Sequence, residues 1–147
     1  MERINKLYPK SSSICNCMNI RRASRAVTQF YDEVLQPSGL TIAQLGLLRH
    51  IELAEKITIS ALAKMIRIDR TTLNRNLKPM AEAGLIVINP GEDSRTREIT
   101  LTEEGKVAVT NAWKLWGEAQ VSLKEYLGEE DLTKLIQLLS KLEALVP

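Results

Sequence analysis

Apolar residues recur at helical spacing in long stretches near both ends of the chain. Residues 14–35 contain no Gly or Pro, and their apolar positions repeat every three to four residues, which predicts one long helix. Residues 103–127 and the segment after Gly128 show the same pattern, and Thr102 is a good N-cap for the first of these helices. The repeating residues are Ile14, Cys17, Ile20, Val27, Phe30 and Val34 near the start, and Leu132, Leu135, Ile136, Leu139 and Leu142 near the end.

Shorter elements are predicted between these helices. The segment QPSGLT breaks the first helix, and Thr41 is the N-cap of a second helix that runs to about Ala54. The β-branched run ITIS predicts a short edge strand or an extended connector. Ser60 is then expected to cap a short helix that ends at about Ile66.

A further helix and a pair of strands follow. Asp69 is the predicted N-cap of this helix, which ends near Ala83 and Gly84, where glycine supplies a left-handed residue. The runs LIVINP and REITLT, separated by the turn GEDSRT, predict a two-stranded hairpin. Helices followed by a hairpin form a winged helix-turn-helix. We therefore expect a single domain that is mainly α with a small β-wing.

Charge is unevenly distributed along the chain. The net charge of the 147 residues is only +2, but residues 1–31 hold six basic side chains against one acidic, and residues 64–78 hold five against one. Residues 117–147 instead hold six acidic side chains and three basic ones. Local clustering of positive charge is typical of a phosphate-binding surface. Residues 1–13 are expected to form a loose polar arm.

The helix that follows Asp69 has one apolar face and one polar face. At about 100° per residue, Leu73, Leu77 and Met80 share one side, and the opposite arc holds no acidic residue. A solvated face normally mixes Glu with Lys, whereas arginine and asparagine recognise base edges and lysine neutralises phosphate. This arc therefore predicts a DNA-facing helix. Its predicted contact residues are Arg70, Thr71, Thr72, Asn74, Arg75 and Lys78.

Pro79 lies inside the same helix. Proline lacks the amide hydrogen and clashes with the carbonyl four residues earlier, which is that of Arg75. We expect a bend or a loosened last turn between Arg75 and Gly84. The first two turns, which would face DNA, are expected to be unaffected.

Several other classes of protein are disfavoured. No apolar run approaches the ~20 residues of a membrane span, and the N-terminal segment lacks the apolar core of a secretory signal, so we expect a cytoplasmic protein without a membrane partner. His50, the only histidine, lies in a plain apolar helical context that favours a structural or surface role. The absence of a Gly-rich phosphate loop, a nucleophile–base pair or a His/Cys metal set argues against an enzyme, a metal and a cofactor. The alternative to a DNA-binding regulator is a helical module whose basic helix binds an acidic protein.

Two segments carry a resemblance to a known family. LAKMIRIDRTTLNRNLKPMAEAGLI and GEDSRTREITLTEEG resemble the MarR family of bacterial transcription regulators, and the resemblance covers nearly the whole chain from Ile14. The wing signature of that family, Asp-x-Arg, is Asp93-Ser94-Arg95 here. The resemblance implies that Arg95 contacts the minor groove or a phosphate, that Arg97 is a second contact, and that Asp93 holds the wing by pairing with Arg95 or nearby backbone. The chain departs from many members at Arg67, where a small residue is common.

The same resemblance implies an architecture and a function. The single chain 1–147 would contain a winged helix-turn-helix at 41–101 and dimerisation helices at 14–40 and 102–147. The homodimer would bind double-stranded DNA at an inverted-repeat operator, as a repressor that a small molecule or thiol oxidation releases. The leucines of the last helix also fit an intrachain core.

The first helix is similar to the organic-hydroperoxide-sensing, OhrR-type branch of that family. Cys17 has the position of the peroxidatic cysteine and Tyr31 that of a tyrosine that hydrogen-bonds it, whereas Arg21 replaces the second such tyrosine. An organic hydroperoxide is then the implied signal, and nearby cations would favour the reactive thiolate of Cys17 or of Cys15. The alternative is that both cysteines are small buried helix residues.

A small aromatic or phenolic ligand is the other candidate signal. By the same resemblance it would bind in the cleft between the winged domain and the dimerisation helices. Trp113 and Trp116 are weak evidence for such a site, because an aromatic residue on a helix is more often part of a core.

Overall fold

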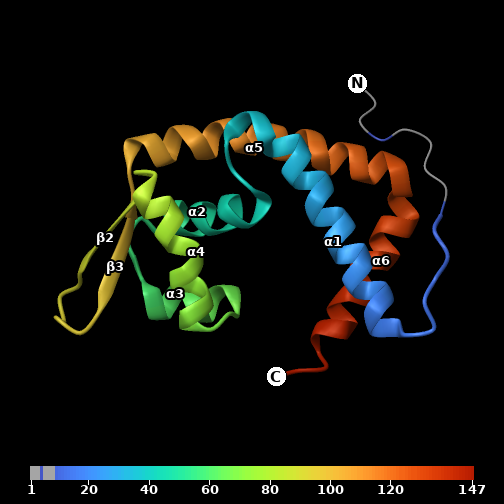
Figure 1. The fold of residues 1–147 in the computed structure, drawn as a ribbon, viewed down its shortest axis with the longest axis horizontal. Helices are drawn as coiled ribbons and strands as arrows, with labels where there is room; N and C mark the ends of the chain where they lie inside the picture. The colour runs from blue at the N-terminus through green and yellow to red at the C-terminus, as the bar shows by residue number, and fades with distance from the viewer. Residues whose placement is uncertain (1–3, 5–8) are drawn as a thin grey trace.

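The chain folds into two lobes connected by a long helix (Figure 1). The computed structural model describes residue 4 and residues 9–147, so residues 1–3 and 5–8 of the predicted arm lie outside the described residues. The mainly helical architecture with a small sheet confirms the predicted fold class. The elements are α1 (Asn16–Leu35), the 3-10 turn η1 (Gln36–Ser38), α2 (Ile42–Ala54), β1 (Ile57–Thr58), α3 (Ile59–Ile66), α4 (Arg70–Glu82), β2 (Ile86–Pro90), β3 (Arg97–Leu101), α5 (Glu103–Leu127) and α6 (Glu129–Glu143).

Helix α1 begins two residues later than the apolar pattern predicts. Cys15 is its N-cap and has an extended backbone. The side chain of Asn19 accepts a hydrogen bond from the Ser13 amide (2.7 Å) and donates one to the Ser13 carbonyl (2.9 Å). This pair of bonds folds the preceding segment back onto the first turn, so Ile14 stays outside the helix and is fully exposed.

The predicted cap of α3 at Ser60 is wrong, because Thr58 is the N-cap. The Thr58 hydroxyl accepts a hydrogen bond from the Ala61 amide at 3.1 Å. Ile57 of the strand and Ile59, the first residue of the helix, are both buried, so the chain keeps both side chains in the core as it passes directly from strand to helix. The other predicted N-caps, Thr41 and Thr102, are confirmed.

The three strands form an antiparallel sheet in the order β1-β3-β2. Ile99 of the central strand pairs with Ile57 on one side and with Ile88 on the other, and it is completely buried. The predicted hairpin and the predicted edge strand are therefore both confirmed. A tight turn closes the hairpin at Gly91, where a β-carbon would lie only 2.2 Å from the Thr96 hydroxyl oxygen.

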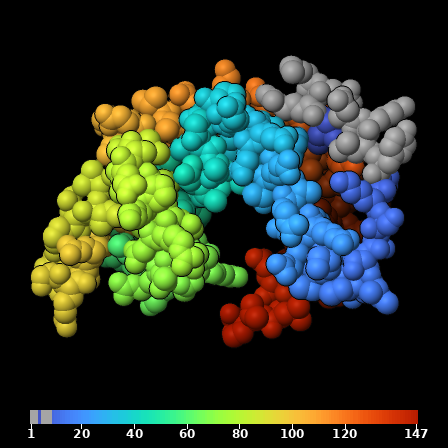
Figure 2. All heavy atoms as spheres, viewed as in Figure 1, coloured from blue at the N-terminus to red at the C-terminus, as the bar shows by residue number. Residues whose placement is uncertain are grey.

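Two apolar cores correspond to the two lobes. The winged lobe comprises α2, α3, α4, the sheet and the start of α5. It holds the larger core, built on Leu48, Ile51, Leu62 and Ile99 among others, and Leu35 at the end of α1 is buried in this core too. The helical lobe comprises α1, the end of α5 and α6, and its small core is built on Tyr31, Val34 and Ala119. An open hollow separates much of the two lobes (Figure 2).

Candidate nucleic-acid interface

The N-terminus of α4 is held by a double interaction between Asp69 and Thr72. The Asp69 carboxylate accepts one hydrogen bond from the Thr72 amide (2.9 Å) and another from the Thr72 hydroxyl (2.6 Å). These bonds hold the pKa of Asp69 below its ordinary value, with the hydroxyl of Thr72 as the largest cause. Asp69 is thus the N-cap that the sequence predicts. Of the predicted contact residues, Thr72 has its hydroxyl engaged in this cap.

The two faces of α4 are separated as the helical wheel predicts. Leu73, Leu77 and Met80 are at most 1% exposed and pack in the core of the winged lobe. The polar face is exposed, and within the described part of the chain none of its cations forms an ion pair. It therefore presents uncompensated positive charge. The exposed residues are Arg70, Thr71, Asn74, Arg75 and Lys78.

Helix α4 continues without interruption through Pro79 to Glu82. The Ala83 amide donates to the Pro79 carbonyl at 2.9 Å, and Gly84 has the left-handed conformation predicted for the residue after the helix (φ +77°). The helix therefore ends where it was expected to end. The bend predicted at Pro79 stays a prediction.

Arg67 lies in the turn between α3 and α4 and has a left-handed backbone, with φ +58° and ψ +47°. Glycine adopts this conformation at little cost and other residues rarely do. This geometry accounts for the small residue that many members of the resembled family carry there. In this chain the same position exposes a guanidinium one turn before the start of α4.

The turn of the hairpin is organised around Asp93. Its Oδ1 accepts hydrogen bonds from the Arg95 amide (3.0 Å) and from Arg95 Nε (3.3 Å), and its Oδ2 accepts one from Arg95 Nη2 (3.1 Å). The pairing with Arg95 holds the pKa of Asp93 below its ordinary value. The predicted pairing of Asp93 with Arg95 is thus present. The Arg95 side chain remains 88% exposed, and Arg97 at the start of β3 is exposed too.

The elements that carry these residues belong to one lobe. Figure 1 shows α3, α4 and the β2–β3 hairpin together at one end of the molecule. A major groove about 12 Å wide admits an α-helix, and a narrow minor groove attracts arginine. The structure thus combines an exposed basic helix with an exposed arginine on a neighbouring hairpin, which is the arrangement of a winged helix-turn-helix.

The candidate sensor cysteines are on the surface. Cys15 and Cys17 are both exposed free thiols, so the interpretation as buried helix residues is wrong for the isolated chain. Tyr31 is buried and its hydroxyl donates to Gln120 Oε1 on α5, and burial raises the pKa of this phenol. Tyr31 and Cys17 lie fourteen residues apart on one helix, roughly 21 Å along its axis. One chain therefore does not bring them together.

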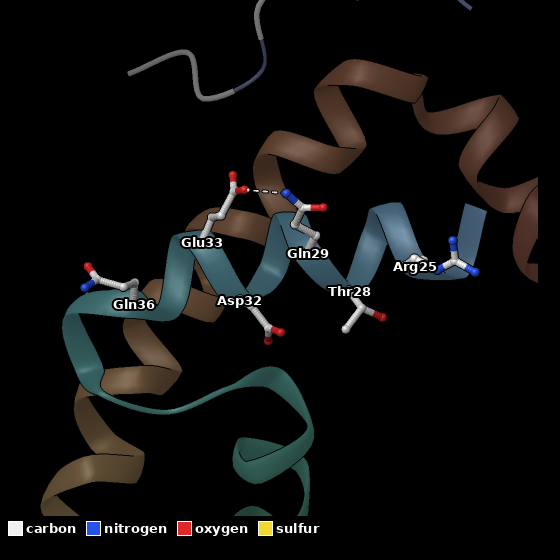
Figure 3. Close-up of a pocket in the computed structure, with 6 residues that line it drawn as sticks. All are labelled: Arg25, Thr28, Gln29, Asp32, Glu33 and Gln36. Atoms are coloured by element: carbon white, nitrogen blue, oxygen red, sulfur yellow. Dashed lines mark hydrogen bonds between the residues drawn. The ribbon is translucent and has the colours of Figure 1, made fainter. Parts of the chain in front are cut away.

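Two further features were not foreseen from the sequence. A shallow, open surface depression of about 570 Å³ lies along the polar face of α1 (Figure 3); its lining residues are Arg25, Thr28, Gln29, Asp32, Glu33 and Gln36. On α2, the guanidinium of Arg49 lies 4.7 Å from the ring centroid of Trp113, which stacks on Trp116 at 4.4 Å. Sixty-four residues separate Arg49 from Trp113 in the chain, so local sequence carries no signal for this contact.

Two features are absent from the described residues. Across residue 4 and residues 9–147, no group of three or more His, Cys, Asp or Glu side chains is placed to hold a metal ion. In the same residues, no helix is sufficiently long and apolar to span a membrane.

Comparison with known proteins defines the class of this winged helix-turn-helix. The family model for the MarR family matches residues 38–96, from the end of η1 to the hairpin turn. The transcriptional regulator SarZ of Staphylococcus haemolyticus is 32% identical over 102 residues, which cover 67% of this chain and 69% of SarZ. The chain belongs to the MarR family of transcriptional regulators.

Solved structures with the same fold include complexes with DNA. The M. tuberculosis regulator MosR in complex with DNA is 37% identical, with a TM-score of 0.77 over 90% of this chain and 99% of MosR. A mutant of E. coli MarR complexed with operator DNA is 25% identical, with a TM-score of 0.78 over 89% of this chain and 99% of that one. The similarity therefore covers both lobes.

Proposed function

We propose that the chain is a homodimeric, sequence-specific DNA-binding transcriptional regulator that acts in the cytoplasm as a repressor on an inverted-repeat operator. The observation that carries this proposal is the polar face of α4, which is exposed, contains no acid and forms no ion pair within the described residues. Similar proteins that were solved with DNA support it.

The residues of the interface have distinct proposed roles. Arg75 and Asn74 lie beyond the first turn of α4 and would contact base edges, because arginine pairs with guanine and asparagine with adenine. Arg70 and Lys78 would contact phosphates, which add affinity but no sequence preference. Arg95, exposed on the wing, would enter the minor groove.

Homodimerisation is supported by the apolar surface of α6. This helix has no buried residue in the single chain, although leucine and isoleucine recur along one side of it. Its largest apolar side chains are 39–58% exposed, and a continuous apolar face of this kind marks an interaction site. A second copy is the proposed occupant, because a symmetric dimer would place two α4 helices on one duplex. The exposed side chains are Leu135, Ile136, Leu138, Leu139 and Leu142.

The proposed release signal is oxidation of Cys17 by an organic hydroperoxide. In this step the thiolate sulfur attacks the terminal peroxide oxygen, the O–O bond breaks, and the alkoxide leaves and takes a proton from water to become the organic alcohol. The cysteine is oxidised to a sulfenic acid while the peroxide is reduced. Exposure of the thiol and the arginine one helical turn further along the same helix, Arg21, support reaction at this position.

A small aromatic acid is the second candidate signal, and the geometry at Arg49 supports it. Trp113 is 41% exposed and lies beneath the Arg49 guanidinium, with Trp116 stacked on it. A planar ring would pack against the exposed edge of the indole, while its carboxylate would bind the guanidinium in place of Glu52, which is its partner in the structure. Quenching of tryptophan fluorescence by such acids, lost in Arg49→Ala, would support this signal over oxidation.

Salt dependence of DNA binding distinguishes the proposal from the protein-interaction alternative. The logarithm of the affinity for an operator duplex should fall linearly with the logarithm of the salt concentration. The slope of this line is proportional to the number of phosphate contacts. Absence of duplex binding at low salt, together with capture of an acidic protein, would favour the alternative.

A further inference from the structure

The winged lobe and the helical lobe meet through a narrow junction. Three residues, Ile42, Leu115 and Trp116, pack against both apolar cores. They lie at the start of α2 and in the middle of α5, close to the end of α1. Over much of their remaining extent the lobes are separated by the hollow seen in Figure 2. Besides the continuous helix α5, the angle between the lobes therefore depends on these contacts and on Leu35 at the end of α1, which is buried in the core of the winged lobe.

One polar contact in this junction comes from α1. Asp32 Oδ1 accepts a hydrogen bond from the backbone amide of Ile42 at 2.8 Å. Ile42 is the first residue of α2, and the first amides of a helix have no partner within the helix. Figure 3 shows Asp32 pointing from α1 toward the chain that enters α2, whereas Glu33 points to the other side and accepts a bond from Gln29.

This bond is not needed to start α2. The helix already has a complete capping box, in which the Thr41 hydroxyl accepts from the Gln44 amide (3.2 Å) and the Gln44 side chain accepts from the Thr41 amide (3.0 Å). Such a box is a sufficient N-terminal signal. The Asp32 carboxylate therefore adds a connection between the lobes to a helix that is already capped.

Helix α2 is coupled to α4 through the core of the winged lobe. Leu45, Leu48 and Ile51 of α2 are at most 2% exposed and share a core with Leu73 and Leu77 of α4. Closely packed cores transmit displacement because side chains have little free volume to absorb it. A rotation of α2 about its N-terminus would thus move α4 relative to α1.

We propose that Asp32 is a positioning residue that sets the angle between the lobes and, through it, the operator spacing that the regulator selects. The inference rests on the proposed function, because it assumes a homodimer with one α4 in each half-site. The dimer holds its two helical lobes together, so the orientation of each winged lobe fixes the separation of the two α4 helices.

Operator spacing is a sensitive measure of this geometry. One additional base pair moves a half-site by about 3.4 Å along the duplex and rotates it by roughly 35° about the axis. A rigid dimer should bind the altered operator more weakly, because its two α4 helices no longer match the half-sites. A dimer with a loosened junction can move its winged lobes and keep its affinity. Loss of spacing discrimination with unchanged affinity for one half-site is therefore the signature of a positioning role.

The test compares Asp32→Ala with wild type on operators whose spacer is native, one base pair longer or one base pair shorter. Wild type should prefer the native spacer by roughly tenfold or more, the size of a single base-pair mismatch. Asp32→Ala should lose most of that preference while keeping wild-type affinity for a single half-site. Asp32→Asn should keep the spacing preference, because the side-chain amide oxygen can still accept a hydrogen bond from the backbone amide of Ile42. The matched control is Glu33→Ala, which removes a neighbouring carboxylate and should keep the preference.

In the DNA-binding experiment, two outcomes would overturn the inference: an unchanged spacing preference in Asp32→Ala, or an equal loss of affinity on every duplex and on the single half-site. A measurement without DNA separates this failure from that of the proposed function. Spin labels at Arg22→Cys on α1 and Glu82→Cys at the end of α4, with both native cysteines replaced by serine, report the distance between lobes. Labelled chains are diluted into unlabelled protein. The distance distribution should broaden in Asp32→Ala and not in Glu33→Ala, and equal widths would contradict the positioning role.

Discussion

Asp93 holds Arg95 through three hydrogen bonds, one from the Arg95 backbone amide and two from its guanidinium. The Arg95 side chain nevertheless remains 88% exposed. The carboxylate thus restricts the conformation of the arginine without covering it. An arginine that is already ordered loses less conformational entropy when it enters a groove, so the pair prepares the wing for DNA.

Arg95→Ala is expected to weaken DNA binding to a similar extent on all sequences. Because the contact is with phosphate or the minor groove, the slope of log affinity against log salt concentration should fall by about 1. Titrations of labelled duplexes at several salt concentrations measure this slope. Lys106→Ala, which removes an exposed cation paired with Glu103 on α5, is the control and should leave the slope unchanged.

The role of Asp93 is tested by combining its substitution with that of Arg95. If Asp93 acts by ordering Arg95, Asp93→Ala should weaken binding in the wild-type background and should not weaken it further in Arg95→Ala. Equal losses in the two backgrounds would mean that Asp93 contributes independently of Arg95.

The cap at Asp69 predicts a defined pH dependence of stability. Its pKa is lowered in the folded chain by the bonds from Thr72, so its stabilising contribution is fully present above the ordinary Asp value of about 3.9 and is lost as the pH falls through the lower folded-state pKa. The Tm of Asp69→Ala should therefore lie below that of wild type at neutral pH, and the difference should shrink in acid. A difference in Tm that stays constant down to pH 2.5 would contradict this role. Glu104→Ala, at the start of α5, is a control for removing an exposed acid.

The exposed face of α6 predicts the effect of placing a charge in it. Leu139 is 45% exposed in the single chain and lies among other exposed leucines. Leu139→Glu should convert the dimer to a monomer with a retained helical CD spectrum, because the carboxylate would be buried unpaired in the interface. Sedimentation velocity measures the molar mass. Val87→Glu, an exposed position on β2 in the winged lobe, should remain a dimer.

Oxidative release should depend on one of the two cysteines. After treatment with cumene hydroperoxide, wild type and Cys15→Ser should dissociate from the operator, whereas Cys17→Ser should stay bound. Fluorescence anisotropy follows the dissociation, and mass spectrometry identifies the oxidised residue. Release that persists in Cys17→Ser would exclude this thiol as the trigger.

Local sequence was sufficient to predict α4 and the hairpin. Asp69 is a capping residue directly before a leucine seam, and the alternation of Ile99 and Leu101 with polar residues is typical of a strand. In both cases the residues that determine the element lie within it. The tertiary packing only needs to be compatible with these strong local preferences for helix and strand.

Other features depended on residues distant in the chain. Ser60 and Thr58 are both acceptable caps, and the helix begins at Ile59 directly after the two-residue strand that pairs with the distant strand β3. The exposure of the cysteines likewise depends on what packs against α1, which residue type alone does not predict. The contact of Asp32 with Ile42 spans ten residues and two elements, and no periodicity indicates it.

The most direct test of the central claim is the base preference of Arg75. Sequences bound by wild type and by Arg75→Ala are selected from random DNA, and affinities for the wild-type operator are then measured. If Arg75 pairs with a base edge, the variant should lose preference at one position in each half-site and bind the operator more weakly by about 1–3 kcal/mol. An unchanged selected sequence together with unchanged affinity would contradict the assignment of α4 as the helix that reads DNA.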